Sequence, residues 1–104
     1  MNNTIQLLKS FLEMDPTDSF TQFALAMEYN KAGDVHQSEI TFKKLVEADP
    51  GYVGTYYHLG KLLEVLGKVD EARSVFKDGI VVAENSNDQH AASELKQALL
   101  ELDF

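Results

Sequence analysis

The chain has 104 residues, a length typical of one compact domain or one short repeat array. Hydrophobic residues make up 44% of it and charged residues 25%, a balance that excludes an intrinsically disordered chain. Cysteine is absent, which excludes disulfides, thiol catalysis and cysteine-based zinc sites. The formal net charge of −8 argues against binding to nucleic-acid phosphates or to anionic lipid surfaces.

Neither end of the polypeptide reads as a targeting or membrane segment. The first four residues lack the basic region of a signal peptide, and no apolar stretch of sufficient length follows them. The longest apolar runs, at 23–27 and 80–83, are too short to cross a bilayer. We therefore expect a cytoplasmic protein.

An offset of 34 residues brings similar residue types into register over the middle of the chain. The aligned pairs include large, small, glycine, aromatic and proline positions: Leu25 with Leu59, Ala26 with Gly60, Gly33 with Gly67, Ser38 with Ala72, Phe42 with Phe76, and Pro16 with Pro50. Agreement at this many informative positions indicates an internal repeat, and a repeat of this period is typical of stacked helical hairpins.

The elements predicted from this repeat begin with a leading helix over residues 4–14. It precedes Asp15-Pro16 as residues 38–48 precede Asp49-Pro50, so it corresponds to the second helix of a repeat whose first helix is absent. A helix over 18–32 follows, because its apolar positions recur at spacings of three and four, and Gly33 ends it as a C-terminal cap. The next helix, 35–48, ends before Pro50, because proline disfavours helical geometry in the preceding residue.

The second period repeats this plan and is followed by a cap. A first helix contains Tyr56 and Leu63 and ends before Gly67, and a second helix spans about 69–84. After the polar break at 85–88, a capping helix over 88–102 places four apolar residues on one face, Ala92, Leu95, Leu99 and Leu102. Its polar residues, Glu94, Lys96, Gln97 and Glu101, are expected to face away. The sequence thus predicts an all-α protein of about six helices.

Small residues at fixed places in both periods indicate close helix packing. Ala26 and Gly60 are expected where two antiparallel helices approach closely, and Phe42 and Phe76 are expected to fill the gap between pairs. A single pair cannot bury both of its faces, so neighbouring pairs are expected to stack.

The pattern of large and small residues on the first helix, a small residue four before phenylalanine on the second, and a closing Asp-Pro resembles the tetratricopeptide repeat. The family's tryptophan position holds Gln22 in one repeat and Tyr56 in the other, and its closing proline is Glu84 in the second. The resemblance covers residues 17–84. It implies an antiparallel helix-hairpin solenoid in a single domain, 1–104, with repeats at 17–50 and 51–84.

No residue pattern points to catalysis, a cofactor or a metal. His36, His58 and His90 are too far apart in sequence to form a metal-binding pair on one helix. A Gly-x-Ser-x-Gly elbow, a phosphate loop and a dinucleotide fingerprint are all missing. We therefore expect no enzymatic activity.

The resemblance implies that the first helix of each repeat lines a concave groove for a peptide or a partner helix. Seven residues are expected on that face: Phe20, Phe23, Met27, Lys31, Tyr57, His58 and Lys61. An apolar stripe bordered by charge is a candidate interaction site with aromatic anchors. An open alternative is that the leading helix covers Phe20 and Phe23.

These observations predict a non-catalytic protein–protein interaction module. The acidic charge favours a neutral or basic protein or peptide partner, and neither nucleic acid nor a membrane is expected to bind. The alternative function is self-association to a homodimer through the same apolar stripe.

Overall fold

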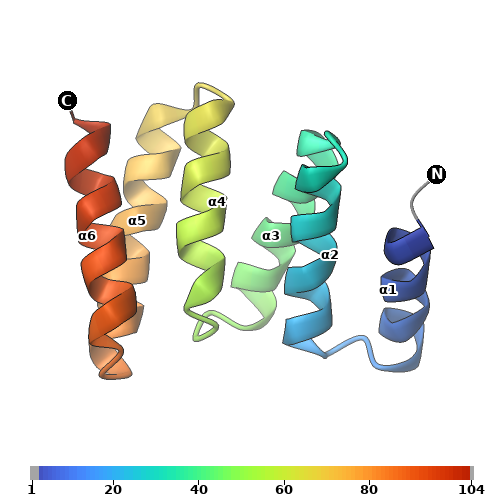
Figure 1. The fold of residues 1–104 in the computed structure, drawn as a ribbon. Coiled ribbons are helices and arrows are strands. Elements are labelled where there is room, and N and C mark those ends of the chain that lie inside the picture. Colours follow the sequence, from blue (N-terminus) through green and yellow to red (C-terminus); the bar gives the residue numbers. More distant parts are fainter. Residues whose placement is uncertain (1–2, 104) are drawn as a thin grey trace. The chain divides into compact units, whose positions relative to one another are not determined.

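The computed structural model describes residues 3–103 and contains, within that range, α-helices and no strands (Figure 1). The helices are α1 (Asn3–Met14), α2 (Ser19–Lys31), α3 (Val35–Ala48), α4 (Gly54–Val65), α5 (Val69–Asn85) and α6 (Gln89–Leu102). The predicted all-α repeat fold is confirmed, and helix α3 has the predicted bounds. No described helix combines the length and the apolar character needed to cross a membrane.

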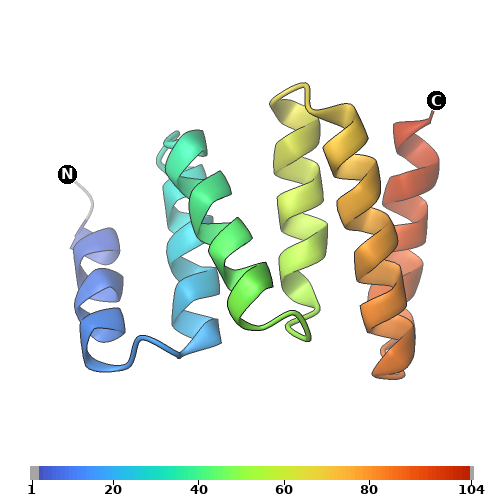
Figure 2. The same cartoon turned by 180° about the vertical axis from the view of Figure 1, so that it is seen from behind.

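The helices form two compact units. Unit 1 contains α1 to α3 and ends at Asp49, whereas unit 2 begins at Pro50 and contains α4 to α6. In unit 1, α2 packs against both α1 and α3. In unit 2, α5 lies beside α4 and α6, as Figures 1 and 2 show from opposite sides. The predicted single domain over 1–104 stays a prediction.

Three tight turns make consecutive helices antiparallel. Each turn has one residue in the left-handed region: Gly33 (φ 86°), Gly67 (φ 78°) and Asn87 (φ 59°). The residue after it donates its backbone N–H to a carbonyl five positions earlier, at 2.9, 2.8 and 2.8 Å respectively. This bond is typical of the Schellman cap, in which glycine is preferred and asparagine is tolerated. The sequence predicted the glycine caps, whereas the Asn87 cap was not predicted.

The hairpin of unit 1 is held at a small-residue crossing. Ala26 and Ser38 are both fully buried, and the Ser38 hydroxyl donates a hydrogen bond of 2.7 Å to the backbone carbonyl of Ala26. Phe42 and Leu45 are also fully buried on α3. Small residues at the crossing allow α2 and α3 to approach closely, and the bulky residues fill the space around it.

The hairpin of unit 2 uses glycine at the equivalent place. A Cβ atom on Gly60 would lie within 2.7 Å of ring carbons of Phe76, and Phe76 is fully buried. Phe76 therefore fills space inside its own hairpin, against Gly60, whereas the sequence analysis placed it between pairs. Gly79 has a similar role on α5, because a Cβ there would lie 2.5 Å from Cβ of Tyr56 and 3.0 Å from Cδ1 of Leu95.

Helix α1 differs from the other second helices because it has no buried residue. Ile5, Leu8 and Leu12 are half-buried. Leu7, Phe11 and Met14 recur at spacings of four and three on another face and are 53%, 46% and 84% exposed. The offset of 34 aligns Phe11 with Leu45, which is fully buried. At Phe11, helix α1 therefore exposes to solvent a position that α3 buries.

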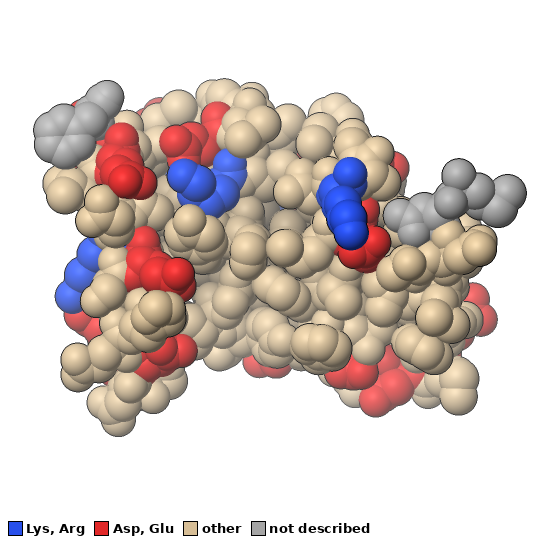
Figure 3. Space-filling model, in the orientation of Figure 1, with Lys and Arg blue, Asp and Glu red and all other residues tan. Residues whose placement is uncertain are grey.

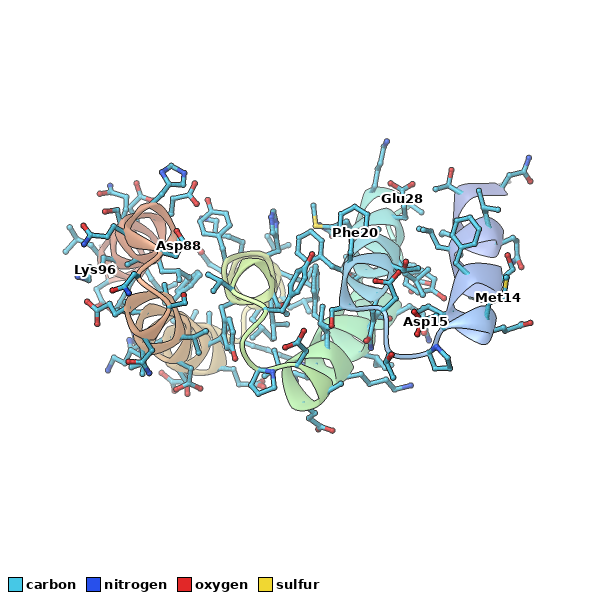
Figure 4. All side chains as sticks on the ribbon, turned by 90° about the horizontal axis from the view of Figure 1, so that it is seen from below. Met14, Asp15, Phe20, Glu28, Asp88 and Lys96 are labelled. Atoms are coloured by element: carbon cyan, nitrogen blue, oxygen red, sulfur yellow. The ribbon has the colours of Figure 1, made fainter. Side chains whose placement is uncertain are left out.

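Helix α6 ends the chain with a charged outer face. Ala92, Leu95 and Ala98 are buried. An offset of 36 aligns these residues with Tyr56, Leu59 and Leu62 of α4, and it aligns Lys96 with Gly60. Lys96 lies on the side of α6 away from α4 (Figure 4), and its Nζ lies 3.0 Å from Oε2 of Glu84. A helix cannot cross closely over this lysine, so α6 has the expected character of a cap.

The Gly60–Phe76 contact leads to a prediction about stability. Gly60→Ala should lower the free energy of unfolding by about 1–3 kcal/mol, because the added methyl group overpacks the crossing. This loss should appear even though alanine favours the helix by about 1 kcal/mol. Denaturant unfolding followed by circular dichroism measures the change.

The control is a double-mutant cycle with Phe76→Leu, which makes room for the methyl group. We expect Gly60→Ala to cost less in the Phe76→Leu background than in the wild type. Equal costs in the two backgrounds would contradict the proposed steric origin.

Candidate functional site

The four predicted groove residues of unit 1 differ in how far they are accessible. Phe20 is 67% exposed on the side of α2 that faces away from α3 (Figure 4), so α1 leaves it uncovered. Lys31 is exposed and Met27 is half-buried. Phe23 is half-buried, and its ring packs edge-on against Phe42, with the centroids 6.0 Å apart. Phe23 is therefore partly a core residue, whereas Phe20 and Met27 present apolar surface.

The three predicted residues of unit 2 lie together on one side of α4, and all are half-buried. The rings of Tyr57 and His58 meet edge to face, with the centroids 5.4 Å apart and an interplanar angle of 89°. Lys61 is one turn further along α4, and its Nζ lies 3.3 Å from Oε1 of Glu64. The two aromatic residues are thus in contact with one another, and each keeps part of its surface accessible.

Two clefts open between α4 and α6 around Tyr57. The first has a volume of about 340 Å³ and includes Tyr57, His58, Asp88, His90 and Glu94 in its lining. The second, of about 300 Å³, is lined by Tyr57, Glu94, Gln97, Ala98 and Glu101. Tyr57 and Glu94 belong to both clefts. Together the clefts form a groove, which we call the α4–α6 groove.

Glu94 and Glu101 were not predicted as site residues, because their spacing in the sequence indicated only the outer face of a capping helix. The signal that identifies them is the offset of 36 between α4 and α6, which aligns Glu94 with His58. Helix α6 is thus equivalent to a first helix of a repeat, and its residues flank the same groove as those of α4.

Burial lowers the pKa of His58 from its ordinary value of 6.5, and the nearby Glu94 carboxylate opposes this shift only in part. The ring is therefore neutral at pH 7. The pKa of His58 is lower in the folded protein than in the unfolded chain. Below pH 6.5 the imidazole of His58 is therefore protonated to a greater extent in the unfolded chain than in the folded protein. Stability is accordingly lost as the pH falls from 6.5 through the lowered pKa.

Other features of the described residues do not form a chemical centre. No group of three or more histidine, aspartate or glutamate side chains is placed to hold a metal ion within residues 3–103. A cleft of about 280 Å³ near Glu84, Ser93 and Lys96 is mainly polar. Another of about 350 Å³ lies between Pro50 and Val82. Neither contains a predicted site residue.

Comparisons with known proteins agree with this architecture. The family model described as tetratricopeptide repeat matches residues 21–52 and 53–86. A repeat-containing protein of Pseudomonas aeruginosa is 28% identical over 99 residues, which cover 95% of this chain and 94% of that protein.

Solved structures show the same fold. The solution structure of a tetratricopeptide repeat domain protein from Salinibacter ruber is 46% identical, with a TM-score of 0.81 over 85% of this chain and 89% of that one. The crystal structure of PcrH in complex with the chaperone-binding region of PopD has a TM-score of 0.87 at 16% identity and covers 95% of this chain and 75% of that one. The two matched repeats span more than half of the sequence, and the chain belongs to the tetratricopeptide repeat family.

Proposed function

We propose that this protein is a non-catalytic interaction module that binds an extended peptide or a helix of a partner protein. Each unit contributes its own first-helix surface. In unit 1 it consists of Phe20, Met27 and Lys31, with Phe23 as a supporting core residue. In unit 2 it consists of Tyr57, His58 and Lys61. The repeat family and its fold support a protein–protein interaction module.

The observation that carries this proposal is the exposure of Phe20. A phenylalanine that is 67% exposed loses the stabilisation it would gain from burial, about 1.5–3 kcal/mol. Met27 and Tyr57 add apolar surface that remains partly accessible. Aromatic and methionine side chains are enriched at binding surfaces, where they supply area and adaptability.

A solved structure of similar fold supports the mode of binding. PcrH was solved in complex with the chaperone-binding region of PopD, so a fold of this kind accommodates a segment of another protein. The overall charge of −8 favours approach by a neutral or basic partner and disfavours nucleic acid. In unit 1 an apolar anchor on the partner would contact Phe20 or Met27, and in unit 2 Lys61 would contribute to the orientation of a bound segment.

Peptides selected from a random phage-displayed library on the immobilised full chain provide a test. We expect Tyr57→Ala and Met27→Ala each to weaken a selected peptide about tenfold or more, because hot-spot truncations cost about 1.4 kcal/mol or more. Isothermal titration calorimetry with the synthetic peptide measures the affinities.

Matched controls are Ile40→Ala on α3 and Val81→Ala on α5, which truncate exposed apolar residues of second helices. Both should bind as the wild type does, and thermal melts should show that every variant remains folded. Unchanged affinity in Tyr57→Ala and Met27→Ala, or equal losses in the controls, would place the binding surface elsewhere.

A second candidate function is self-association, which the outer face of α1 favours. Leu7, Phe11 and Met14 form an exposed apolar stripe. Leu45 and Gly79 align with Phe11 in the two repeats, and both are buried in their hairpins. A second copy of this chain could cover the stripe with its own α1. This interface differs from the shared stripe considered in the sequence analysis.

Sedimentation analysis over a wide range of protein concentrations tests the second candidate. The wild type should show a mass that rises toward that of a dimer, and Phe11→Ser with Met14→Ser should remain monomeric, because polar side chains remove the apolar face. A wild type that stays monomeric at the highest concentration would rule out self-association.

A further inference from the structure

The α4–α6 groove has an acidic lining. Asp88, Glu94 and Glu101 contribute carboxylates to its two clefts, and among residues 3–103 no lysine or arginine belongs to the lining of either cleft. Figure 3 shows acidic side chains gathered over α6 on the face that this view presents. Because burial keeps the His58 ring neutral at pH 7, the histidine adds no compensating charge at that pH. The groove therefore favours a cation.

Glu94 is the carboxylate best placed to receive that cation. The Asp88 carboxylate accepts the backbone N–H of Ala91 at 3.0 Å, and the Glu101 carboxylate accepts Nε2 of Gln97 at 3.1 Å. By contrast, Oε2 of Glu94 lies 3.7 Å from Nε2 of His90, a pair that carries opposite charges only when the histidine is protonated. The Glu94 side chain is about half exposed, at 52%, so a partner can reach it.

Tyr57 gives the same groove an aromatic wall, and the floor is apolar. The Tyr57 ring lines both clefts, as does Glu94. Leu95 is in the lining of the first cleft and Ala98 in that of the second, and both are buried residues of α6. An aromatic ring attracts a cation over its face, and an apolar floor contacts the methylene groups that carry it.

We propose that the α4–α6 groove binds an arginine side chain of the partner segment, with its guanidinium between the Tyr57 ring and the Glu94 carboxylate. This inference rests on the proposed function and names the chemistry that the groove recognises. Arginine fits better than lysine, because its planar guanidinium stacks on an aromatic ring and donates two parallel hydrogen bonds to one carboxylate. A purely apolar side chain would leave the carboxylates poorly solvated.

The test uses a synthetic peptide selected from the random library and a second peptide in which citrulline replaces its arginine. Citrulline keeps the shape of the side chain and removes its charge. We expect the citrulline peptide to bind the wild type about tenfold or more weakly, a change that corresponds to about 1.4 kcal/mol. Glu94→Gln should weaken the arginine peptide to a similar extent, and it should have little effect on the citrulline peptide.

Asp78→Asn on α5 is the matched control, because it removes the same charge from an exposed site on a second helix. It should change the affinity far less than Glu94→Gln does. Raising the salt concentration should weaken the arginine peptide more than the citrulline peptide.

The other outcomes separate this inference from the proposed function. Peptides that need Tyr57 but carry no arginine, or that bind equally well with citrulline, would overturn the inference and leave the interaction module intact. Peptides that bind independently of both Tyr57 and Met27 would overturn the proposed binding surface as well as the inference. The mass of the wild type in solution could instead rise with protein concentration, and Glu94→Gln could abolish that rise. This result would show that a second copy of the chain occupies the α4–α6 groove, and it would also overturn the inference.

Discussion

The close crossing of two helices within each hairpin is the constraint on which the remaining structure depends. In unit 1 the crossing is made by Ala26 and Ser38, whose hydroxyl is satisfied by a helical carbonyl at 2.7 Å. In unit 2 Gly60 leaves no room even for a methyl group beside Phe76. Both arrangements bring the helix axes close together and bury Phe42 and Phe76 completely. They therefore fix which face of each first helix is buried.

The remaining face of the first helices stays at least partly accessible, because successive residues of a helix point about 100° apart. Tyr56 is buried against Gly79, whereas the next residue, Tyr57, lines the α4–α6 groove. In unit 1 the buried and the accessible residues of the first helix are less clearly separated. The ring of Phe23 lies at the edge of the exposed face and still contacts the ring of Phe42. Packing and the proposed recognition thus involve neighbouring residues that point in different directions.

The helices and their limits could be predicted from the sequence because the repeat places a glycine after each first helix and an Asp-Pro after two of the second helices. The left-handed Asn87 and the role of α6 could not be predicted in this way. Helix α6 aligns with α4 at an offset of 36 rather than 34. Glu94 therefore fell outside the repeat alignment. The division between exposed Phe20 and packed Phe23 likewise depends on side-chain packing, which spacing alone does not determine.

The two terminal helices have opposite capacities for extension. Another hairpin added after α6 would have to desolvate the Lys96 ammonium, which pairs with Glu84, and burial of such a charge carries a large penalty. Helix α1 instead has an exposed apolar face against which an additional helix could pack. Longer arrays engineered from this sequence should therefore be built by adding modules at the amino terminus, and carboxy-terminal fusion would first require replacement of Lys96 by a small residue.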